Sequence, residues 1–151
     1  MYKILVVILL NLMLTACTAM AQEERQGIDA MEEYFDFVDY GGGAIFPEQI
    51  PEKDWNKFFI IDTRNATQYE NEHIPGAVNI EWRQLLAHRS ELPLDKTILV
   101  YCNTGTLSAQ AGFALRLAGF DNLNIIQGGM REWREKGGFK AYERAIQAPQ
   151  H

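Results

Sequence analysis

One cysteine in a short loop is the residue of this chain that is best placed to do chemistry. Cys102 follows five β-branched, apolar or aromatic residues (97–101) and precedes the loop Asn103, Thr104, Gly105, Thr106, Leu107 and Ser108. Because residues 108–118 are nearly all apolar, the stretch predicts a buried strand, a loop and a core helix. Such a junction has unpaired backbone N–H groups and the positive end of a helix dipole, which lower the pKa of a thiol. The loop therefore predicts a nucleophilic thiolate at Cys102, with a buried structural cysteine as the alternative.

The residues that follow Cys102 have the types expected around a bound anion. Gly105 permits the positive φ that curls a loop into an anion-binding nest, and Thr106 or Ser108 can cap the helix. A metal site is not expected, because the three histidines are scattered along the chain without a second His or a Glu at ligand spacing. The chemistry of this loop therefore rests on the thiol and requires no metal or organic cofactor.

The amino terminus predicts an export signal over residues 1–21. A basic head that ends at Lys3 precedes an apolar run over residues 4–14, which is too short to span a bilayer. Two processing sites compete after this run. Leu-Thr-Ala-Cys at 14–17 resembles a bacterial lipobox and would leave Cys17 as a lipidated terminus, whereas Ala-Met-Ala at 19–21 is an ordinary cleavage site before Gln22. We expect a periplasmic protein that is either soluble or anchored to the membrane through Cys17.

The cysteine count adds to the case for chemistry at Cys102. The sequence holds two cysteines, and export processing either removes or acylates Cys17. The remaining thiol has no disulfide partner in its own chain and is exposed to oxidation in that compartment. A purely structural side chain at this position could be Ala or Val without that liability, so the cysteine itself favours a chemical role.

Composition and charge limit the kinds of partner that the chain can bind. The formal net charge is −6, and it becomes −7 when the first 21 residues, which include Lys3, are removed. An acidic chain without basic runs is a poor binder of nucleic acid. The roughly 130 remaining residues suffice for one domain with a real core. We expect an acidic amino-terminal extension with a peripheral amphipathic helix over 22–43, the main domain over 44–140 and a carboxyl-terminal tail over 141–151.

Strand and helix patterns alternate through the main domain. Strands are predicted at 44–46, 58–61, 77–80, 97–101 and 123–126, and helices from Pro51, at 81–88, at 108–118 and at 130–136. Gly119 is at the position where a glycine ends the central helix. This alternation predicts an α/β domain with a mostly parallel sheet, whose ligands bind beyond the carboxyl ends of the strands. Cys102 lies at such an end.

Five motifs over residues 44–140 resemble those of a single rhodanese domain, in the family's order and spacing. They are Asp62-x-Arg64, His73-Ile74-Pro75-Gly76-Ala77-Val78-Asn79-Ile80, Cys102-x-x-Gly105, Leu117-Ala118-Gly119-Phe120 and Gly128-Gly129-Met130 with Trp133. The resemblance implies a central five-stranded parallel sheet flanked by helices. It also implies that backbone amides of residues 103–108 surround a persulfide on Cys102. The implied activity is transfer of a sulfane sulfur from thiosulfate or a persulfide donor to cyanide or a thiol.

One position departs from the pattern of the family. Many active members carry Arg or Lys in the loop, often just before the position of Ser108, where this chain has Leu107. The loop therefore offers thiosulfate no charge-assisted hydrogen bond from its own side chains. Near the loop, a structural ion pair is favoured over a catalytic role for Asp62 and Arg64, with Glu70 as a further candidate partner.

Other functions fit parts of the same pattern. A persulfide carrier without turnover, or a rhodanese-type binding module, remains the alternative to an enzyme, and its partner would be a protein that donates or accepts sulfur. Phosphatase or arsenate reductase chemistry would need an arginine six residues after the cysteine, where Ser108 stands. A dithiol oxidoreductase would need a second cysteine beside Cys102, and the sequence has none there.

Overall fold

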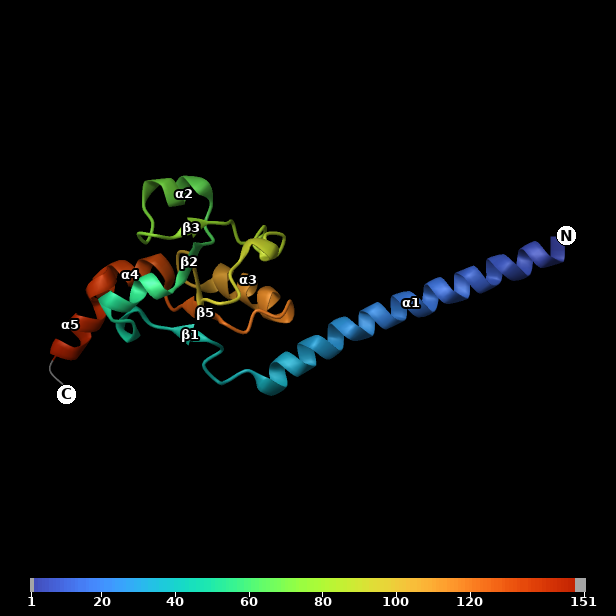
Figure 1. The fold of residues 1–151 in the computed structure, drawn as a ribbon, viewed down its shortest axis with the longest axis horizontal. Helices are drawn as coiled ribbons and strands as arrows, with labels where there is room; N and C mark the ends of the chain where they lie inside the picture. The colour runs from blue at the N-terminus through green and yellow to red at the C-terminus, as the bar shows by residue number, and fades with distance from the viewer. Residues whose placement is uncertain (1, 149–151) are drawn as a thin grey trace. The chain divides into compact units, whose positions relative to one another are not determined.

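The computed structural model describes residues 2–148, which fall into two compact units with a boundary between Val38 and Asp39. The first unit is one helix, α1 (Tyr2–Phe37), drawn in blue in Figure 1. The part Val6–Phe37 is long and apolar enough to cross a membrane by length and composition. A signal sequence near the amino terminus meets the same criterion, so this property agrees with an anchor and with an export signal alike.

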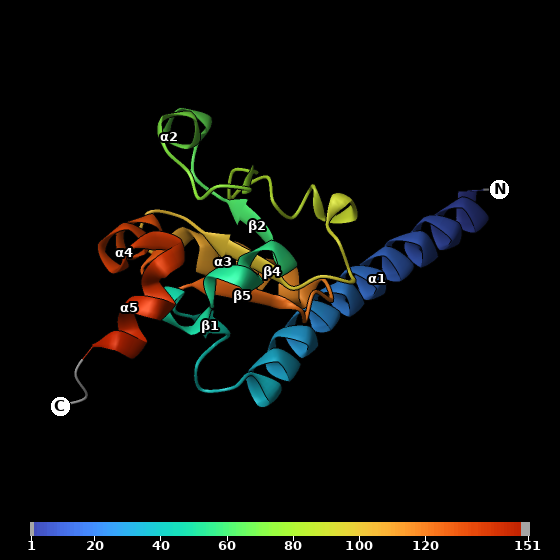
Figure 2. The same ribbon diagram turned by 60° about the vertical axis from the view of Figure 1, so that its left-hand side comes forward.

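The second unit is built on a sheet of five parallel strands, confirming the predicted fold class. The strands are β1 (Ala44–Ile45), β2 (Phe59–Asp62), β3 (Val78–Asn79), β4 (Ile98–Tyr101) and β5 (Leu123–Ile126). Their order in the sheet is β1-β5-β4-β2-β3, which places β4 at the centre (Figure 2). Since all pairs are parallel, the carboxyl ends of the strands lie along one edge of the sheet.

The core lies on both faces of this sheet, because successive side chains of a strand point to opposite faces. One cluster contains Ile60, Leu99, Tyr101, Ile126, Ile74, Met130, Trp55 and Trp133. The cluster on the other face contains Ile61, Ile98, Val100, Ile125, Leu85, Ala111 and Leu115. All four residues of β4 are buried, as expected for a strand that is covered on both sides.

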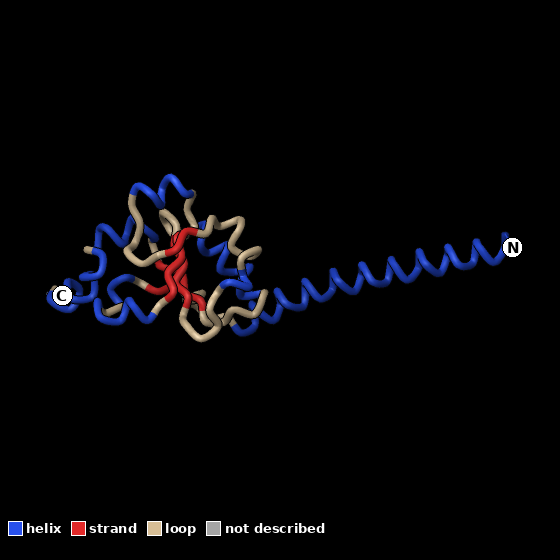
Figure 3. The backbone as a smooth tube through the Cα atoms, turned by 45° about the horizontal axis from the view of Figure 1, so that its top comes forward, coloured by secondary structure: helices blue, strands red, loops and turns tan. Residues whose placement is uncertain are grey.

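Helices and short 3₁₀ turns surround the strands (Figure 3). The α-helices are α2 (Ala66–Asn71), α3 (Thr106–Leu117), α4 (Gly129–Lys136) and α5 (Ala141–Gln147). The 3₁₀ helices are η1 (Pro47–Gln49), η2 (Glu52–Lys57), η3 (Arg89–Glu91) and η4 (Gly138–Lys140). The predicted helices at 108–118 and 130–136 are confirmed as α3 and α4, and the helix predicted from Pro51 is the 3₁₀ helix η2.

The helix predicted at 81–88 was wrong. Residues 82–88 form consecutive hydrogen-bonded turns, and η3 follows them. Gln84 N–H donates to the Glu81 carbonyl and Arg89 N–H donates to the Leu86 carbonyl, bonds that reach back three residues. Over 81–89 the structure has one bond that reaches back four residues, from His88 N–H to the Gln84 carbonyl, so the repeated bond of an α-helix does not form.

Two short helices lie where the sequence predicted none. α2 follows β2, and the Asn65 side chain caps it by accepting a hydrogen bond from Gln68 N–H at 2.9 Å. α5 occupies most of the segment expected to be a tail, and its first residue, Ala141, is 1% exposed. α5 lies beside α4 in both Figure 1 and Figure 2 and is therefore part of the folded domain.

Candidate active site

Cys102 lies directly after β4, at the carboxyl edge of the sheet, as the sequence predicted. α3 begins four residues later at Thr106, so the loop between strand and helix is very short. Gly105 is the N-cap of α3 and has φ +95°, a conformation that strains any residue with a Cβ atom. The tight loop keeps the thiol beside the first turn of α3, where free N–H groups gather.

Hydrogen-bond donors surround the sulfur of Cys102. Gly105 N–H donates to Sγ at 3.2 Å, and the Ser108 hydroxyl lies 3.7 Å from Sγ. The same hydroxyl also donates to the Gly105 carbonyl at 2.9 Å, which fixes the Ser108 side chain inside the loop. Cys102 is 2% exposed and Ser108 is fully buried, so the sulfur is held by donors that water does not reach freely. This environment suits a negative charge on sulfur.

The pKa of Cys102 reflects two opposing effects. Burial opposes ionisation and by itself would raise the pKa. The backbone N–H groups of Ser108, Thr104 and Leu107, together with the Ser108 hydroxyl, stabilise the thiolate and outweigh burial. The net result is a pKa below the ordinary value for a thiol. A lowered pKa increases the fraction of thiolate, which is the nucleophilic form of a cysteine.

The amino end of α4 fixes the loop from the other side. Met130 N–H donates to the Cys102 carbonyl at 2.8 Å, and Arg131 N–H donates to the Asn103 carbonyl at 3.1 Å. A Cβ atom on Gly129 would overlap the Cys102 carbonyl oxygen and lie 2.8 Å from Thr104 N. Only glycine allows this approach. The sequence marks Gly129 only within a motif and does not single out Arg131, because no local pattern predicts that α4 touches the loop after β4.

The remaining loop residues form the rim of the site. Asn103, Thr104, Thr106 and Leu107 are exposed, with the Leu107 side chain 37% exposed. The hydroxyls of Thr104 and Thr106 lie 3.3 Å apart at this rim. The seven predicted residues, 102–108, thus form the loop after β4 and the first turn of α3, with Cys102, Gly105 and Ser108 buried and the others exposed.

Asp62 and Arg64 form an ion pair next to this loop rather than inside it. Arg64 Nη2 lies 2.6 Å from Asp62 Oδ2 and Arg64 Nε lies 3.0 Å from Asp62 Oδ1, with both side chains buried. The hydrogen bonds with Asp62 raise the pKa of Arg64. Arg64 also donates to the Glu72 carbonyl at 2.6 Å, so the further contact is with Glu72 and not with the suggested Glu70. Nε and Nη2 of Arg64 are thus engaged, and this ion pair links the end of β2 to Glu72, the residue after α2.

The residue before Cys102 belongs to this structural network. The Tyr101 hydroxyl accepts a hydrogen bond from Ile74 N–H at 3.0 Å, and the Arg64 guanidinium lies 5.6 Å from the centre of the Tyr101 ring. Burial raises the pKa of Tyr101, so its hydroxyl stays protonated. His73 stacks on Tyr69, and its Nδ1 lies 2.8 Å from the Tyr69 carbonyl.

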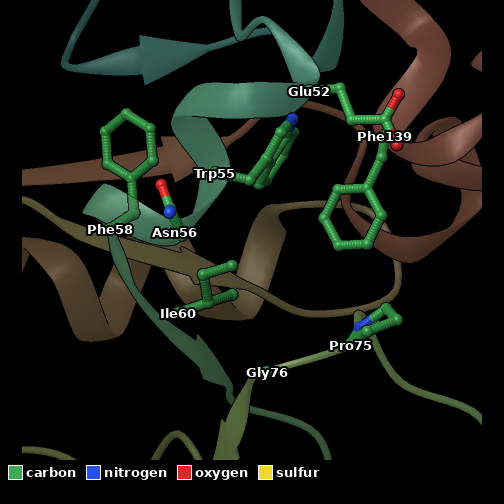
Figure 4. Close-up of a pocket in the computed structure, with 8 residues that line it drawn as sticks. All are labelled: Glu52, Trp55, Asn56, Phe58, Ile60, Pro75, Gly76 and Phe139. Atoms are coloured by element: carbon green, nitrogen blue, oxygen red, sulfur yellow. The ribbon is translucent and has the colours of Figure 1, made fainter.

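The structure also has a cavity of about 470 Å³ away from Cys102. Its lining residues, shown in Figure 4, are Glu52, Trp55, Asn56, Phe58, Ile60, Pro75, Gly76 and Phe139. Phe58 precedes β2 and Pro75 precedes β3, so the cavity lies toward the amino ends of these strands, unlike the loop after β4. Among the side chains that the structure describes, no three from His, Cys, Asp or Glu gather as metal ligands would.

Comparisons with known proteins agree with this architecture. A family model described as a rhodanese-like domain matches residues 47–136. The chain is 32% identical over 76 residues to thiosulfate sulfurtransferase GlpE of Shewanella oneidensis. The matched region covers 50% of this chain and 75% of GlpE. Among solved structures, a rhodanese-related protein from Thermoplasma volcanium aligns with a TM-score of 0.58 and 25% identity, over 63% of this chain and 93% of that one.

One relative is much longer than this chain. The probable adenylyltransferase/sulfurtransferase MoeZ of Mycobacterium tuberculosis is 33% identical over 101 residues. The match covers 63% of this chain but only 25% of MoeZ. The similarity is therefore to one region of a larger protein.

Proposed function

Since the chain belongs to the rhodanese-like domain family, we propose that it is a sulfurtransferase in which Cys102 carries the sulfur as a persulfide. The donor is thiosulfate or a thiol persulfide, and the acceptor is cyanide or a thiol. The observation that carries this proposal is the placement of the Cys102 sulfur among N–H donors at the start of α3, with its pKa lowered. The name of the GlpE relative adds support for thiosulfate as a donor.

The proposed cycle has two displacement steps. The Cys102 thiolate attacks the outer sulfur of thiosulfate, the sulfur–sulfur bond of the donor breaks, and sulfite leaves with the bonding electron pair. The terminal sulfur of the persulfide then carries the negative charge, which the N–H groups of the loop stabilise. Cyanide attacks this terminal sulfur, thiocyanate leaves, and the thiolate is regenerated. Such a cycle predicts ping-pong kinetics.

The test is production of thiocyanate from thiosulfate and cyanide by the purified protein beside its Cys102→Ser variant. We expect turnover by the wild type and none by the variant. Mass spectrometry after incubation with donor alone should show a gain of about 32 Da, one sulfur atom, on the peptide that contains Cys102. A wild type that gains no sulfur from thiosulfate or from a thiol persulfide would contradict the proposal.

A persulfide carrier is the second candidate, and the uncharged loop favours it. None of residues 102–108 is charged, and a protein donor can bring its own recognition surface. For a carrier, Cys102 gains sulfur from a thiol persulfide, yet thiocyanate production from thiosulfate stays at the level of Cys102→Ser. Loading and turnover therefore have to be measured separately.

We further propose that the protein is exported to the periplasm by its first 21 residues. The basic head, the short apolar run and the two processing sites support this, with either a lipid on Cys17 or a terminus at Gln22. In that compartment, partners are small sulfur-containing anions, thiols or a protein that donates or accepts sulfur.

A further inference from the structure

The loop around Cys102 supplies dipoles but no full positive charge. The side chains of residues 102–108 are uncharged, and the nearby N–H groups of Met130 and Arg131 are already engaged by loop carbonyls. Thiosulfate is a dianion, and the sulfite that leaves is negative too. A cation near the mouth of the loop would therefore favour both binding and departure.

Arg131 is the cation that the fold brings against this loop. Its backbone N–H is bonded to the carbonyl of Asn103, one residue after Cys102, at 3.1 Å. Arg131 lies in the first turn of α4, and long side chains on a helix lean back toward the amino end, which here is the end that contacts the loop. The side chain is exposed, and within residues 2–148 its guanidinium makes no hydrogen bond or ion pair. It is thus free to bind an anion.

Other arginines near this edge are engaged elsewhere. Arg64 is buried in its pair with Asp62. Arg83 is paired with Glu81 at 3.0 Å and lies over the Trp82 ring. Arg134, one turn further along α4, is paired with Glu72 at 3.3 Å. Glu132, the next residue along α4, lies 3.9 Å from Lys136, and among the described side chains no acid forms an ion pair with Arg131.

We propose that Arg131 is a specificity-determining residue that binds the anionic end of the sulfur donor while the outer sulfur meets Cys102. This inference rests on the proposed sulfurtransferase function and names a substrate class for that site. A donor with a negative group on the atom next to its transferable sulfur, as in thiosulfate, gains from this contact. A donor whose organic end is positively charged gains nothing.

The test is the rate at which Cys102 gains one sulfur from each of two donors. Thiosulfate carries the anionic end, and cysteamine persulfide carries an ammonium group instead. In the second case the thiolate takes the terminal sulfur and cysteamine leaves as its thiol. The variants are Arg131→Ala, Arg131→Lys and, as the matched control, Arg134→Ala, which removes the same charge from the same helix without touching the loop.

We expect Arg131→Ala to lower the second-order rate constant for loading from thiosulfate by about tenfold or more, the size of one charge-assisted contact. Arg131→Lys should retain part of the rate, and Arg134→Ala should stay within about twofold of the wild type. Loading from cysteamine persulfide should not fall in any variant. Circular dichroism spectra that match the wild type would exclude unfolding as the cause.

Each of the other outcomes overturns one proposal or the other. If Arg131→Ala loads from thiosulfate at the wild-type rate, or if both donors lose rate equally, Arg131 does not recognise the donor's charge. If Cys102 of the wild type gains sulfur from cysteamine persulfide and never from thiosulfate, the proposed role of Arg131 in binding an anionic donor is wrong. The proposed sulfur transfer through Cys102 is then still supported. If the wild type loads from neither donor, the sulfurtransferase function itself fails.

Discussion

The thiol of Cys102 shows how one residue can be buried and ionisable together. Burial alone would keep the thiol neutral, but the donors of residues 104–108 lie around the sulfur and favour the thiolate. The site residues in this loop could be predicted from sequence, because strand, cysteine, glycine and helix follow one another locally. Arg131 could not, since its approach to Asn103 depends on how α4 packs against the loop.

The Ser108 hydroxyl should contribute to the low pKa of Cys102. Because Ser108→Ala removes one donor near Sγ, we expect the pKa of the thiol to rise and the thiolate fraction at neutral pH to fall. Alkylation of Cys102 by iodoacetamide, followed from pH 5 to 10, should slow by about threefold at neutral pH. Thr106→Ala removes an exposed hydroxyl from the same loop and serves as the control. If the pH profile of Ser108→Ala is unchanged, the backbone N–H groups alone lower the pKa of Cys102.

A cation placed in the loop itself should improve the use of thiosulfate. Leu107 is partly exposed at the rim, so Leu107→Arg can add a guanidinium without a cavity or a buried charge. We expect the KM for thiosulfate to fall by about fivefold or more in the thiocyanate assay. Leu107→Gln, polar but uncharged, should not reproduce the gain. In an Arg131→Ala background the same arginine should restore lost rate; if it does not, electrostatics at the rim is not the limiting factor.

Among the helices and strands, prediction from sequence succeeded where neighbouring residues form a run of apolar side chains. β4 and α3 were predictable because long apolar runs must be buried. Residues 81–88 have a helix-like pattern, yet one backbone bond among them reaches back four residues and the segment remains a series of turns. α2 spans only six residues, too few to show a period, although its cap at Asn65 was a usable signal.

The contact between α4 and the loop predicts that Gly129 tolerates no side chain. Gly129→Ala would place a methyl group on the Cys102 carbonyl and would strain a residue at φ +58°. We expect a loss of about 3 kcal/mol or more in the free energy of unfolding, measured in urea, together with a lower kcat. Gly76→Ala is the control, because Gly76 has φ +87° but open space around it, so only the backbone strain of about 1–2 kcal/mol applies. Equal losses in both variants would mean that the α4 contact adds nothing.

The last helix, α5, is expected to stabilise the domain although it follows all the matched motifs. Its first residue, Ala141, is 1% exposed, so Ala141→Asp would bury a carboxylate without a partner. We expect the free energy of unfolding to fall by about 2–4 kcal/mol. Gln147→Asp adds the same charge at the exposed end of α5 and should cost at most about 1 kcal/mol. A variant Ala141→Asp as stable as Gln147→Asp would mean that α5 detaches freely.

At the scale of the whole molecule, alternation of strand and helix patterns was enough to predict the fold class. The parallel sheet and the position of Cys102 at its carboxyl edge follow from that alternation, and the resemblance to the rhodanese family implied five strands. The helix α5 was not predicted within the carboxyl-terminal segment 141–151. It is short, and its burial depends on contacts with η1 and α4 that are distant in the sequence. The helix α1 forms a unit of its own, and its exposed apolar side chains agree with a segment meant for a membrane or for removal.

Processing of the amino terminus can be tested on the complete chain. With the lipobox at 14–17 in use, the protein expressed in a bacterium should incorporate radioactive palmitate and fractionate with membranes. Cys17→Ser should lose both properties, and Cys102→Ser, the matched control, should lose neither. If the wild type carries no label and its mature form begins at Gln22, the ordinary cleavage site operates and Cys17 is discarded with the signal.

Because Cys102 is almost completely buried, the donor and the acceptor of the proposed cycle face different steric limits. The donor has to reach the Cys102 sulfur, whereas the acceptor has to reach the outer sulfur of the persulfide. Without the extra sulfur, Cys102 is 2% exposed, so we expect only a slender donor to reach the thiolate. Once loaded, the reactive atom is the outer sulfur, one sulfur–sulfur bond of about 2.05 Å beyond Sγ. We expect the acceptor to meet a more accessible atom than the donor did. We expect bulky thiols to remove the outer sulfur from the Cys102 persulfide readily, whereas equally bulky donors should not react with the Cys102 thiolate. The presence of the bound sulfur would then determine whether large molecules can react at this site.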